Sequence, residues 1–299
     1  MHCTAIVRGS HAVVGQRHRA FPELILIQTA GTESMANMDE AQAHASRSAA
    51  RGGGVNWNLP GVPGLQVLAD CASRAVPGKA RGDRVGIACP DADGLEGHGL
   101  AMAVAGGIGG DAAGGQAAAV VLSAALHDYY ATPATWEPKQ ALERVLGACN
   151  DWLHARNMRD PEGNGGLATL SVLVLRGGRR FVAHVGDCRI YCLRAGRFQQ
   201  LTRDHLWPRH DMRHIPKRAF GLDGYLVVDY AEGEVLPGDV YVLVTDGVWE
   251  VLGDAAILAA AGREAPADAA DHLVGEALAR QAGYMGRNDA TAIVARMVG

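Results

Sequence analysis

The sequence predicts an α+β fold in which antiparallel sheets carry pairs of helices on their outer faces. The first observation is the order of segments after residue 64: short strand-like runs, two helices, a block of strands, two helices and a final strand. This order lacks the regular strand–helix alternation of a parallel sheet. The second is composition, because 299 residues that are 48% hydrophobic and 20% charged can build one large core. The third is the lack of an internal repeat or long linker after residue 65, so residues 64–299 are expected to form one domain.

Residues 1–63 differ from the rest and are expected to be a disordered or wrongly assigned N-terminal extension. Residues 1–21 contain Arg and no acidic residue, and residues 35–64 are rich in Ala, Ser and Gly. The apolar run ELILIQTA is too short for the core of a signal peptide. An organelle-targeting peptide is an alternative, and Met35 or Met38 would serve as the start of a shorter chain.

The first half of the domain is expected to contain three strands followed by two helices. Short apolar runs predict strands at residues 64–72, 84–89 and 100–105. A helix is predicted over 111–130, where Asp111 could cap the first turn, and a second over 135–156, where Thr135 could be the N-cap. The second helix carries one apolar stripe at helical spacing, formed by Leu142, Val145, Leu146, Cys149, Trp152 and Leu153.

The second half is expected to contain five strands, two helices and a closing strand. The strand-like runs occupy residues 168–175, 180–186, 188–194, 225–231 and 239–245. The helices are expected around residues 247–261 and 267–283, and the final strand at 291–298.

Composition excludes several classes of protein. The net charge of −4 argues against a general nucleic-acid binder, and no apolar run is long enough for a membrane span. The six cysteines contain no CxxC pair, so we expect reduced, mostly buried thiols in a cytoplasmic protein; a zinc or disulfide framework is the alternative. Cys188 and Cys192 lie four residues apart, which on a strand places both on one face for packing.

A glycine-rich stretch stands out at residues 103–118, AVAGGIGGDAAGGQAA, where Asp111 is the one charged residue. The spacing Gly107-x-Gly109-x-x-Ala112 loosely matches a dinucleotide loop, but the second strand with its acidic end is missing. A second interpretation is a tight turn and close helix packing. A third interpretation depends on motifs farther along the chain.

Five motifs occur in a telling order: HVGDCRIY at 184–191, LTRDH at 201–205, RAFG at 218–221, LVTDGVWE at 243–250 and GRNDATAIV at 286–294. Each is weak alone. Together they resemble the metal-dependent protein serine/threonine phosphatases of type 2C, over about residues 64–299. Within that family the chain is most similar to the phosphatase module that some bacteria fuse to a kinase. Because the sequence ends at the last strand, no attached kinase is expected.

The resemblance implies a four-layer α-β-β-α sandwich of two antiparallel sheets with helix pairs outside. It also implies two divalent cations, manganese or magnesium, in a cleft at one edge of the sheets. In that family a water that bridges the cations attacks the phosphorus of phosphoserine or phosphothreonine. The cations lower the pKa of the water and stabilise the developing charge. Such hard cations need several carboxylate oxygens.

Two early ligand positions depart from the family pattern. In the family glycine loop, V-A-D-G-x-G-G, the Asp bridges both metals and the next Gly offers a carbonyl; Gly107 matches the Gly, but Gly106 stands where the Asp belongs. The family segment R-x-x-N-E-D matches residues 78–83, where Asp83 is retained and Gly82 replaces the metal-binding Glu. Lys79 or Arg81 could supply the phosphate-binding cation.

The late positions are mixed. The resemblance assigns a metal ligand to Asp246, and its closing D-N-x-T motif places Asn288 at a ligand position. Asp289 is the next residue, but neighbours on a regular strand face opposite ways, so only a slip or bulge would bring it in. Asp187 and Glu250 match the residues that hold a third, weaker metal in some members; Asp187 could equally be a turn residue.

Two further groups of residues, a histidine-rich segment at 205–218 and the pair Ser171 and Cys188, could in principle carry chemistry. His205, His210, Asp211 and His214 have a spacing that permits a metal such as zinc, but surface histidines of the mobile flap that the family has here are favoured. An interaction surface is a third interpretation; it would use Trp207 with the basic residues Arg209, Arg213, Lys217 and Arg218. Ser171 and Cys188 lie in strands without an obvious base partner, so no nucleophilic triad is predicted.

These positions give two hypotheses. The family pattern places four metal-binding carboxylates at the positions of Gly82, Gly106, Asp246 and Asn288, and of these Asp246 alone is retained. Two adjacent dications among neutral groups would repel each other. We therefore expect a pseudophosphatase that acts in phospho-signalling by binding a phosphorylated protein or a separately encoded kinase, without nucleic-acid or membrane partners. The alternative is an active Mn- or Mg-dependent phosphatase whose site is rebuilt from Asp83, Asp246, Asp289 and waters. Substitute ligands for such a site would come from Asp91, Asp93 or Asp111.

Overall fold

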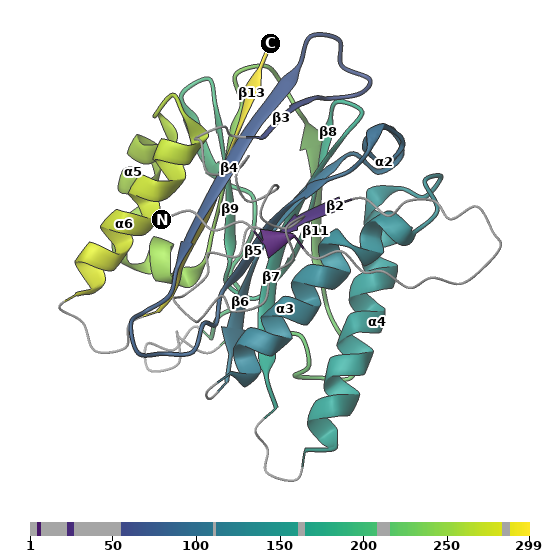
Figure 1. Ribbon diagram of the computed structural model, residues 1–299, viewed down its shortest axis with the longest axis vertical. Coiled ribbons are helices and arrows are strands. Elements are labelled where there is room, and N and C mark those ends of the chain that lie inside the picture. Colours follow the sequence, from purple (N-terminus) through teal and green to yellow (C-terminus); the bar gives the residue numbers. More distant parts are fainter. Residues whose placement is uncertain are drawn as a thin grey trace, which may run out of the picture.

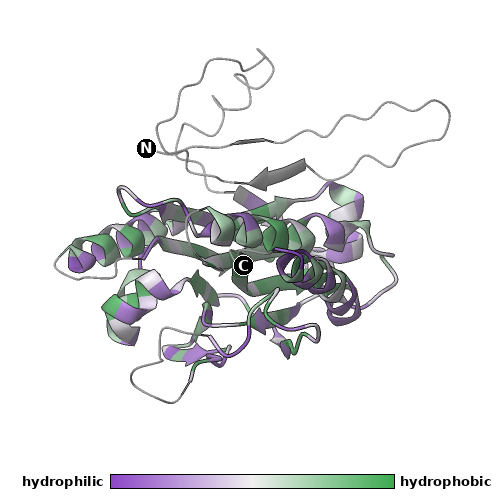
Figure 2. Ribbon diagram, turned by 90° about the horizontal axis from the view of Figure 1, so that it is seen from below, coloured by the Kyte–Doolittle hydropathy of each residue, from purple (hydrophilic) through white to green (hydrophobic). Residues whose placement is uncertain are grey.

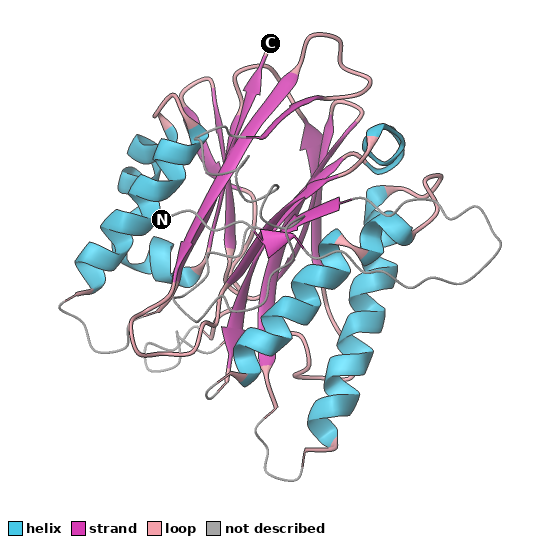
Figure 3. Cartoon of the chain, viewed as in Figure 1, coloured by secondary structure: helices cyan, strands magenta, loops and turns pink. Residues whose placement is uncertain are grey.

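Two antiparallel sheets packed face to face form the centre of the protein (Figures 1 and 3). A computed structural model describes residues 5–6, 23–26, 55–109, 112–160, 165–207, 216–282 and 288–299. Its first sheet has the strand order β1-β2-β5-β6-β7-β8-β11, and its second has the order β10-β9-β12-β13-β4-β3. The strands of the first sheet are β1 (Ala5–Ile6), β2 (Glu23–Leu26), β5 (Arg84–Cys89), β6 (Leu100–Ile108), β7 (Leu167–Arg176), β8 (Arg179–Val185) and β11 (Asp229–Glu234). Those of the second sheet are β3 (Val55–Asn58), β4 (Gln66–Arg74), β9 (Arg189–Arg194), β10 (Arg197–Gln200), β12 (Val240–Val244) and β13 (Ala290–Val298).

Helix pairs cover the outer faces of both sheets. Helices α3 (Ala113–Leu126) and α4 (Pro138–Met158) pack on the first sheet, and α5 (Asp246–Ala261) and α6 (Pro266–Gln281) pack on the second (Figure 1). The short helix α2 (Ala92–His98) joins β5 to β6, and a 3-10 helix at Asp128–Ala131 follows α3. The predicted α+β fold with four layers is confirmed.

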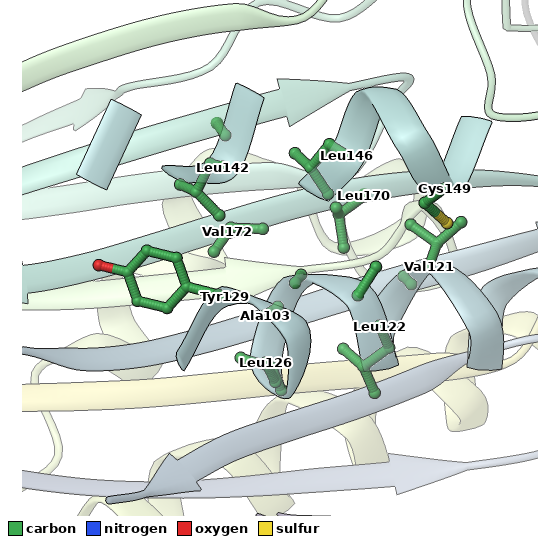
Figure 4. Close-up of a cluster of buried hydrophobic side chains, with 14 of the residues drawn as sticks. Ala103, Val121, Leu122, Leu126, Tyr129, Leu142, Leu146, Cys149, Leu170 and Val172 are labelled. Atoms are coloured by element: carbon green, nitrogen blue, oxygen red, sulfur yellow. The ribbon is translucent and has the colours of Figure 1, made fainter. Parts of the chain in front are cut away.

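The core consists of three apolar layers. One layer joins α3 and α4 to the first sheet, with Leu122, Leu146 and Val172 among its members (Figure 4). Another lies between the sheets, and the third joins α5 and α6 to the second sheet. Strands that are covered on both faces can be mostly apolar. This explains why β7 is buried at every residue from Ala168 to Leu175 and why the strands in Figure 2 are mainly green. Cys188 and Cys192 both belong to the layer between the sheets, as their spacing predicted.

Some predicted boundaries are wrong, for local reasons. Helix α4 begins at Pro138 after Glu137, and not at Thr135, because proline is well suited to the first turn of a helix. Strand β11 begins at Asp229, four residues later than the apolar run suggested, and Val227 before it is 43% exposed. Helix α5 is interrupted at Gly253, whose φ of 72° is readily adopted by glycine.

Part of the predicted extension forms strands. Strand β2 pairs antiparallel with β5, with Leu24 opposite Ala88, and β3 pairs with β4. Most of the remaining residues before Val55 lie outside the described residues. The boundary at residue 63 and the proposed later start stay predictions.

The glycine-rich loop brings three backbone segments into direct contact. A Cβ atom at Gly107, near the end of β6, would overlap the backbone of Gly114 in α3. A Cβ atom at Gly115 would overlap the carbonyl oxygen of Arg81, in the segment that precedes β5. Glycine is therefore required for packing at these positions, which supports the close-packing interpretation of the loop. Asp111, the predicted cap, lies outside the described residues, and the helix begins after Ala112.

We expect Gly115→Ala to destabilise the protein by about 3 kcal/mol, because the added methyl group must displace backbone. Gly147→Ala is the matched control: Gly147 lies inside α4 with no atom within 4 Å of its would-be Cβ. That substitution should stabilise the protein by about 0.5–1 kcal/mol. Urea unfolding of both variants measures the difference, and equal stabilities would contradict the close-packing account.

Candidate metal and phosphate site

A cleft of about 500 Å³ lies at one end of the sandwich, where strand ends and loops of both sheets meet. It is lined by Gly78, Lys79, Ala80, Gly82, Asp83, Gly106, Gly107, Ile108, Gly109, Gly114, Gly115, Thr169, Asp187, Pro216, Asp246, Asn288 and Asp289. The structure thus gathers most of the sequence-predicted site residues. Arg81 and Glu250 are not among the lining residues.

Asp83 lies just before β5 and is buried, with 5% of its surface exposed. The hydroxyl of Thr245 donates a hydrogen bond of 2.6 Å to its Oδ2. Burial raises the pKa of Asp83 well above its ordinary value, and the charges of Asp246 and Asp289 raise it further. The carboxyl group of Asp83 therefore tends to keep its proton in the folded protein unless a positive charge lies close to it.

Asp246 begins α5 and accepts two hydrogen bonds from the protein. The backbone N–H of Gly247 donates to Oδ1 at 2.8 Å, and the side-chain amide of Asn288 donates to Oδ2 at 2.7 Å. Burial raises the pKa of Asp246 to about 6. Asn288 thus contacts Asp246 and presents an N–H donor to it.

Asp289 serves the backbone. Its Oδ1 accepts a hydrogen bond of 2.8 Å from the N–H of Val76, and its Oδ2 accepts from the N–H groups of Gly82 at 2.8 Å and Asp83 at 3.2 Å. Both carboxylate oxygens are engaged with the segment that connects β4 to β5. Asn288 and Asp289 therefore make different contacts, although both line the cleft.

Asp187 lies in the turn between β8 and β9 and is also buried. Burial is the main cause that raises its pKa to about 8, and the charge of Asp246 adds to it. The indole N–H of Trp249 donates to the backbone carbonyl of Asp187 at 2.9 Å and so fixes the turn. Desolvation, with the charge of Asp246, raises the pKa of Glu250 to about 7. Asp187 and Glu250 thus both lie close enough to Asp246 to sense its charge.

The two glycines at ligand positions line the cleft, and a Cβ atom at either would have close neighbours. A Cβ atom at Gly106 would lie 3.0 Å from Thr169 Oγ1 and 3.8 Å from Asp83 Oδ1. A Cβ atom at Gly82 would lie 3.4 Å from the carbonyl oxygen of Gly107. This chain therefore has no side chain at two positions beside Asp83 and Asp289.

The two predicted phosphate-binding cations have different surroundings. Lys79 lines the cleft. The guanidinium of Arg81 donates to the backbone oxygen of Ser73 at 3.0 Å and to its hydroxyl at 2.9 Å. Lys79 is therefore the better placed of the two for a phosphate.

His205 is buried, so the expectation of a surface histidine is wrong for this residue. Its Nδ1 accepts a hydrogen bond of 3.0 Å from the N–H of Gly186, and its Nε2 lies 3.0 Å from Asp229, which also pairs with Arg218. These bonds hold the turn that precedes Asp187. The other members of the histidine segment, His210, Asp211 and His214, lie outside the described residues, as do Arg209 and Arg213. Trp207 is 42% exposed, and the Lys217 ammonium lies 5.3 Å from its ring centre.

Sequence reasoning missed several partners. Thr169 and Thr245 contact the carboxyl groups, yet only the position of Thr245 beside Asp246 could have indicated this. Ser171 does have a base partner, His184, whose Nδ1 lies 2.9 Å from its hydroxyl. Both residues are buried, and burial lowers the pKa of His184 to about 4, so this pair belongs to the core.

The comparisons with known proteins agree on one family. The family model for protein phosphatase 2C matches residues 80–265. The chain belongs to the protein phosphatase 2C family. The serine/threonine phosphatase PstP of Mycobacterium tuberculosis is 29% identical over 235 residues, which cover 73% of this chain and 44% of PstP. This chain therefore spans less than half the length of that relative.

Solved structures give the same result. The PstP structure superimposes with a TM-score of 0.65 at 26% identity, covering 78% of this chain and 99% of that one. PppA, a regulatory component of the type VI secretion system in Pseudomonas aeruginosa, also gives 0.65 at 25% identity, covering 77% and 97%. A PstP catalytic domain in complex with two manganese ions gives 0.64 at 26% identity, covering 79% and 100%.

The residues of this chain do not fit a pair of divalent cations. Among the described residues, no three His, Cys, Asp or Glu side chains are grouped so that they could hold a metal ion. Gly82 and Gly106 offer no side chain, Asn288 donates an N–H into the site, and both oxygens of Asp289 bind backbone. Paired dications need several anionic oxygens to offset their repulsion.

None of the helices in the described part of the chain combines the length and the apolar character that a membrane span requires.

Asp187→Asn should change the pH dependence of stability in the presence of a chelator. The pKa of Asp187 rises from an ordinary value of about 3.9 to about 8 on folding, so the folded state holds the extra proton between these values. The stability of the wild type is then lost progressively as the pH rises from about 4 to 8, and the amide removes this loss. Urea unfolding at pH 5, 7 and 9 should show a growing advantage of the variant. A constant difference would contradict the assignment.

Proposed function

We propose that this chain is a type 2C phosphatase-fold protein with impaired hydrolysis, a pseudophosphatase. It would act in phospho-signalling by binding a phosphorylated protein or a separately encoded kinase. The observation that carries the proposal is the hydrogen bond between the Asn288 amide and Asp246, at a position where the family resemblance places a carboxylate ligand. Family membership supplies the fold, and the chemistry depends on the side chains in the site.

The charge of the cleft supports this proposal. Four carboxyl groups line it, those of Asp83, Asp187, Asp246 and Asp289, and among the described lining residues Lys79 is the one cation. Raised pKa values keep Asp83 and Asp187 protonated at neutral pH, so without divalent cations an entering phosphate group would meet the negative charge of Asp246 and find one cation, Lys79, among the described lining residues. We therefore assign partner recognition to protein surface around the cleft, and not to capture of the phosphate within it.

An active phosphatase with a rebuilt site is the second candidate. The observation that favours it is that Asp187 and Asp246 line the same cleft, and that the charge of Asp246, after burial, helps to raise the pKa of Asp187. A manganese or magnesium ion between them would relieve that cost. This candidate requires the water activation that metal ions supply when bound.

Hydrolysis of p-nitrophenyl phosphate and of a phosphothreonine peptide, with manganese titrated into the assay, decides between the two. We expect wild-type turnover to lie about 10²–10³-fold or more below that of the PstP catalytic domain, the scale of losing one or more groups that stabilise the transition state. Gly106→Asp should raise manganese-dependent turnover, because it returns a carboxylate beside Asp83, whose Oδ1 lies 3.8 Å from the would-be Cβ atom; the side chain of Thr169, at 3.0 Å, must shift slightly to admit it.

Asp246→Ala is the control for residual activity. Wild-type turnover that is comparable to that of the PstP catalytic domain, depends on manganese and disappears in Asp246→Ala would refute the pseudophosphatase and support the rebuilt site. Turnover that survives in Asp246→Ala would identify a contaminating phosphatase.

A further inference from the structure

The three departures from the family pattern differ in kind. Gly82 and Gly106 lack a side chain, and would-be Cβ atoms there would lie 3.4 Å from the carbonyl oxygen of Gly107 and 3.0 Å from Thr169 Oγ1. Asn288 does something else: it places a donor 2.7 Å from Asp246 Oδ2. A hydrogen-bond donor on a carboxylate oxygen provides part of the stabilisation that a cation would otherwise give.

The position of Asn288 is fixed by its surroundings. Its backbone N–H donates to the side-chain oxygen of Gln281 at 2.8 Å, and the side-chain amide of Gln281 donates to the carbonyl of Gly247 at 2.7 Å. Gln281 is 3% exposed. These bonds join the end of α6, the start of α5 and the approach to β13, so Gln281 fixes the backbone of Asn288 beside the residue that follows Asp246.

We propose that the Asn288 amide is the internal counter-donor of Asp246, and that the folded site is completed by protein donors without a divalent cation. This inference rests on the proposed function, because it concerns the same cleft. Two neighbouring acidic residues also accept hydrogen bonds from the protein: the Thr245 hydroxyl donates to Asp83, and three backbone N–H groups donate to Asp289.

Replacing this donor by a carboxylate should make the fold depend on a cation. In Asn288→Asp, a second carboxyl oxygen takes the place of the amide at hydrogen-bond distance from Asp246. Two like charges so close disfavour the folded state unless they share a proton or a cation. The substitution barely changes the size of the side chain, so its effect is electrostatic.

The experiment measures melting temperatures in chelator and in a manganese titration. In chelator, Asn288→Asp should melt several degrees below the wild type. At manganese concentrations about 100-fold above the dissociation constant of the new site, the variant should gain about 5–10 °C. The wild type should shift by less than about 1 °C over the same range.

Asn150→Asp is the matched control. Asn150 is fully buried, and its amide donates to the carbonyl of Asp223 while its oxygen accepts from the N–H of Gly221. This variant should also lose stability, since a buried amide again becomes a carboxylate, but manganese should not restore it. The comparison separates a specific cation response from a general effect on a destabilised protein.

The inference is overturned if Asn288→Asp ignores manganese, if the wild type gains as much as the variant, or if Asn150→Asp responds equally. An Asn288→Asp chain that fails to fold in chelator but folds with manganese supports it. The proposed function is tested separately by the turnover of the wild type. A wild type that hydrolyses phosphothreonine as fast as the PstP catalytic domain would refute that function, whereas the melting data decide only the role of Asn288.

Discussion

The carboxylate of Asp289 ties the two sheets together at the cleft. It precedes β13 of the second sheet and accepts hydrogen bonds from Val76, Gly82 and Asp83, along the connection that crosses to β5 of the first sheet. Hydrogen bonds to a charged group contribute roughly 1.5–3 kcal/mol each to stability. Asp289 therefore stabilises the fold more than an acidic residue on the surface that accepts no such bonds. The places of Gly82 and Asp83 at the cleft depend on it. A carboxylate used in this way has little left to give a metal.

Close contacts between backbone segments also shape the cleft. Glycines let β6, α3 and the segment before β5 approach until their backbones touch, which shapes the floor of the site. The family scaffold is thereby kept intact around Gly107. Positions 82 and 106 carry no side chain, Asn288 donates to Asp246, and burial raises the pKa values of Asp83 and Asp187.

The sequence was sufficient for the fold where patterns were long. The apolar run LAMAVA predicted β6, the largely apolar run ATLSVLVL predicted β7, and the stripe through Leu142 and Leu153 predicted α4. It was insufficient for short elements such as α2 and β10, which carry little periodic signal. In the site, motif spacing brought Asp187 and Asp246 to one cleft. Partners that are distant in sequence, such as His184 for Ser171 or Gln281 for Asn288, depend on packing that no local pattern encodes.

The stoichiometry of manganese bound to the wild-type chain tests the central claim most directly. Isothermal titration calorimetry should be run beside the PstP catalytic domain, whose solved complex holds two manganese ions. The account predicts that this chain takes up fewer than two ions under conditions that saturate both sites of the relative. Two ions bound per chain with comparable affinity would contradict it, and would mean that other oxygens replace the ligands missing at Gly82 and Gly106.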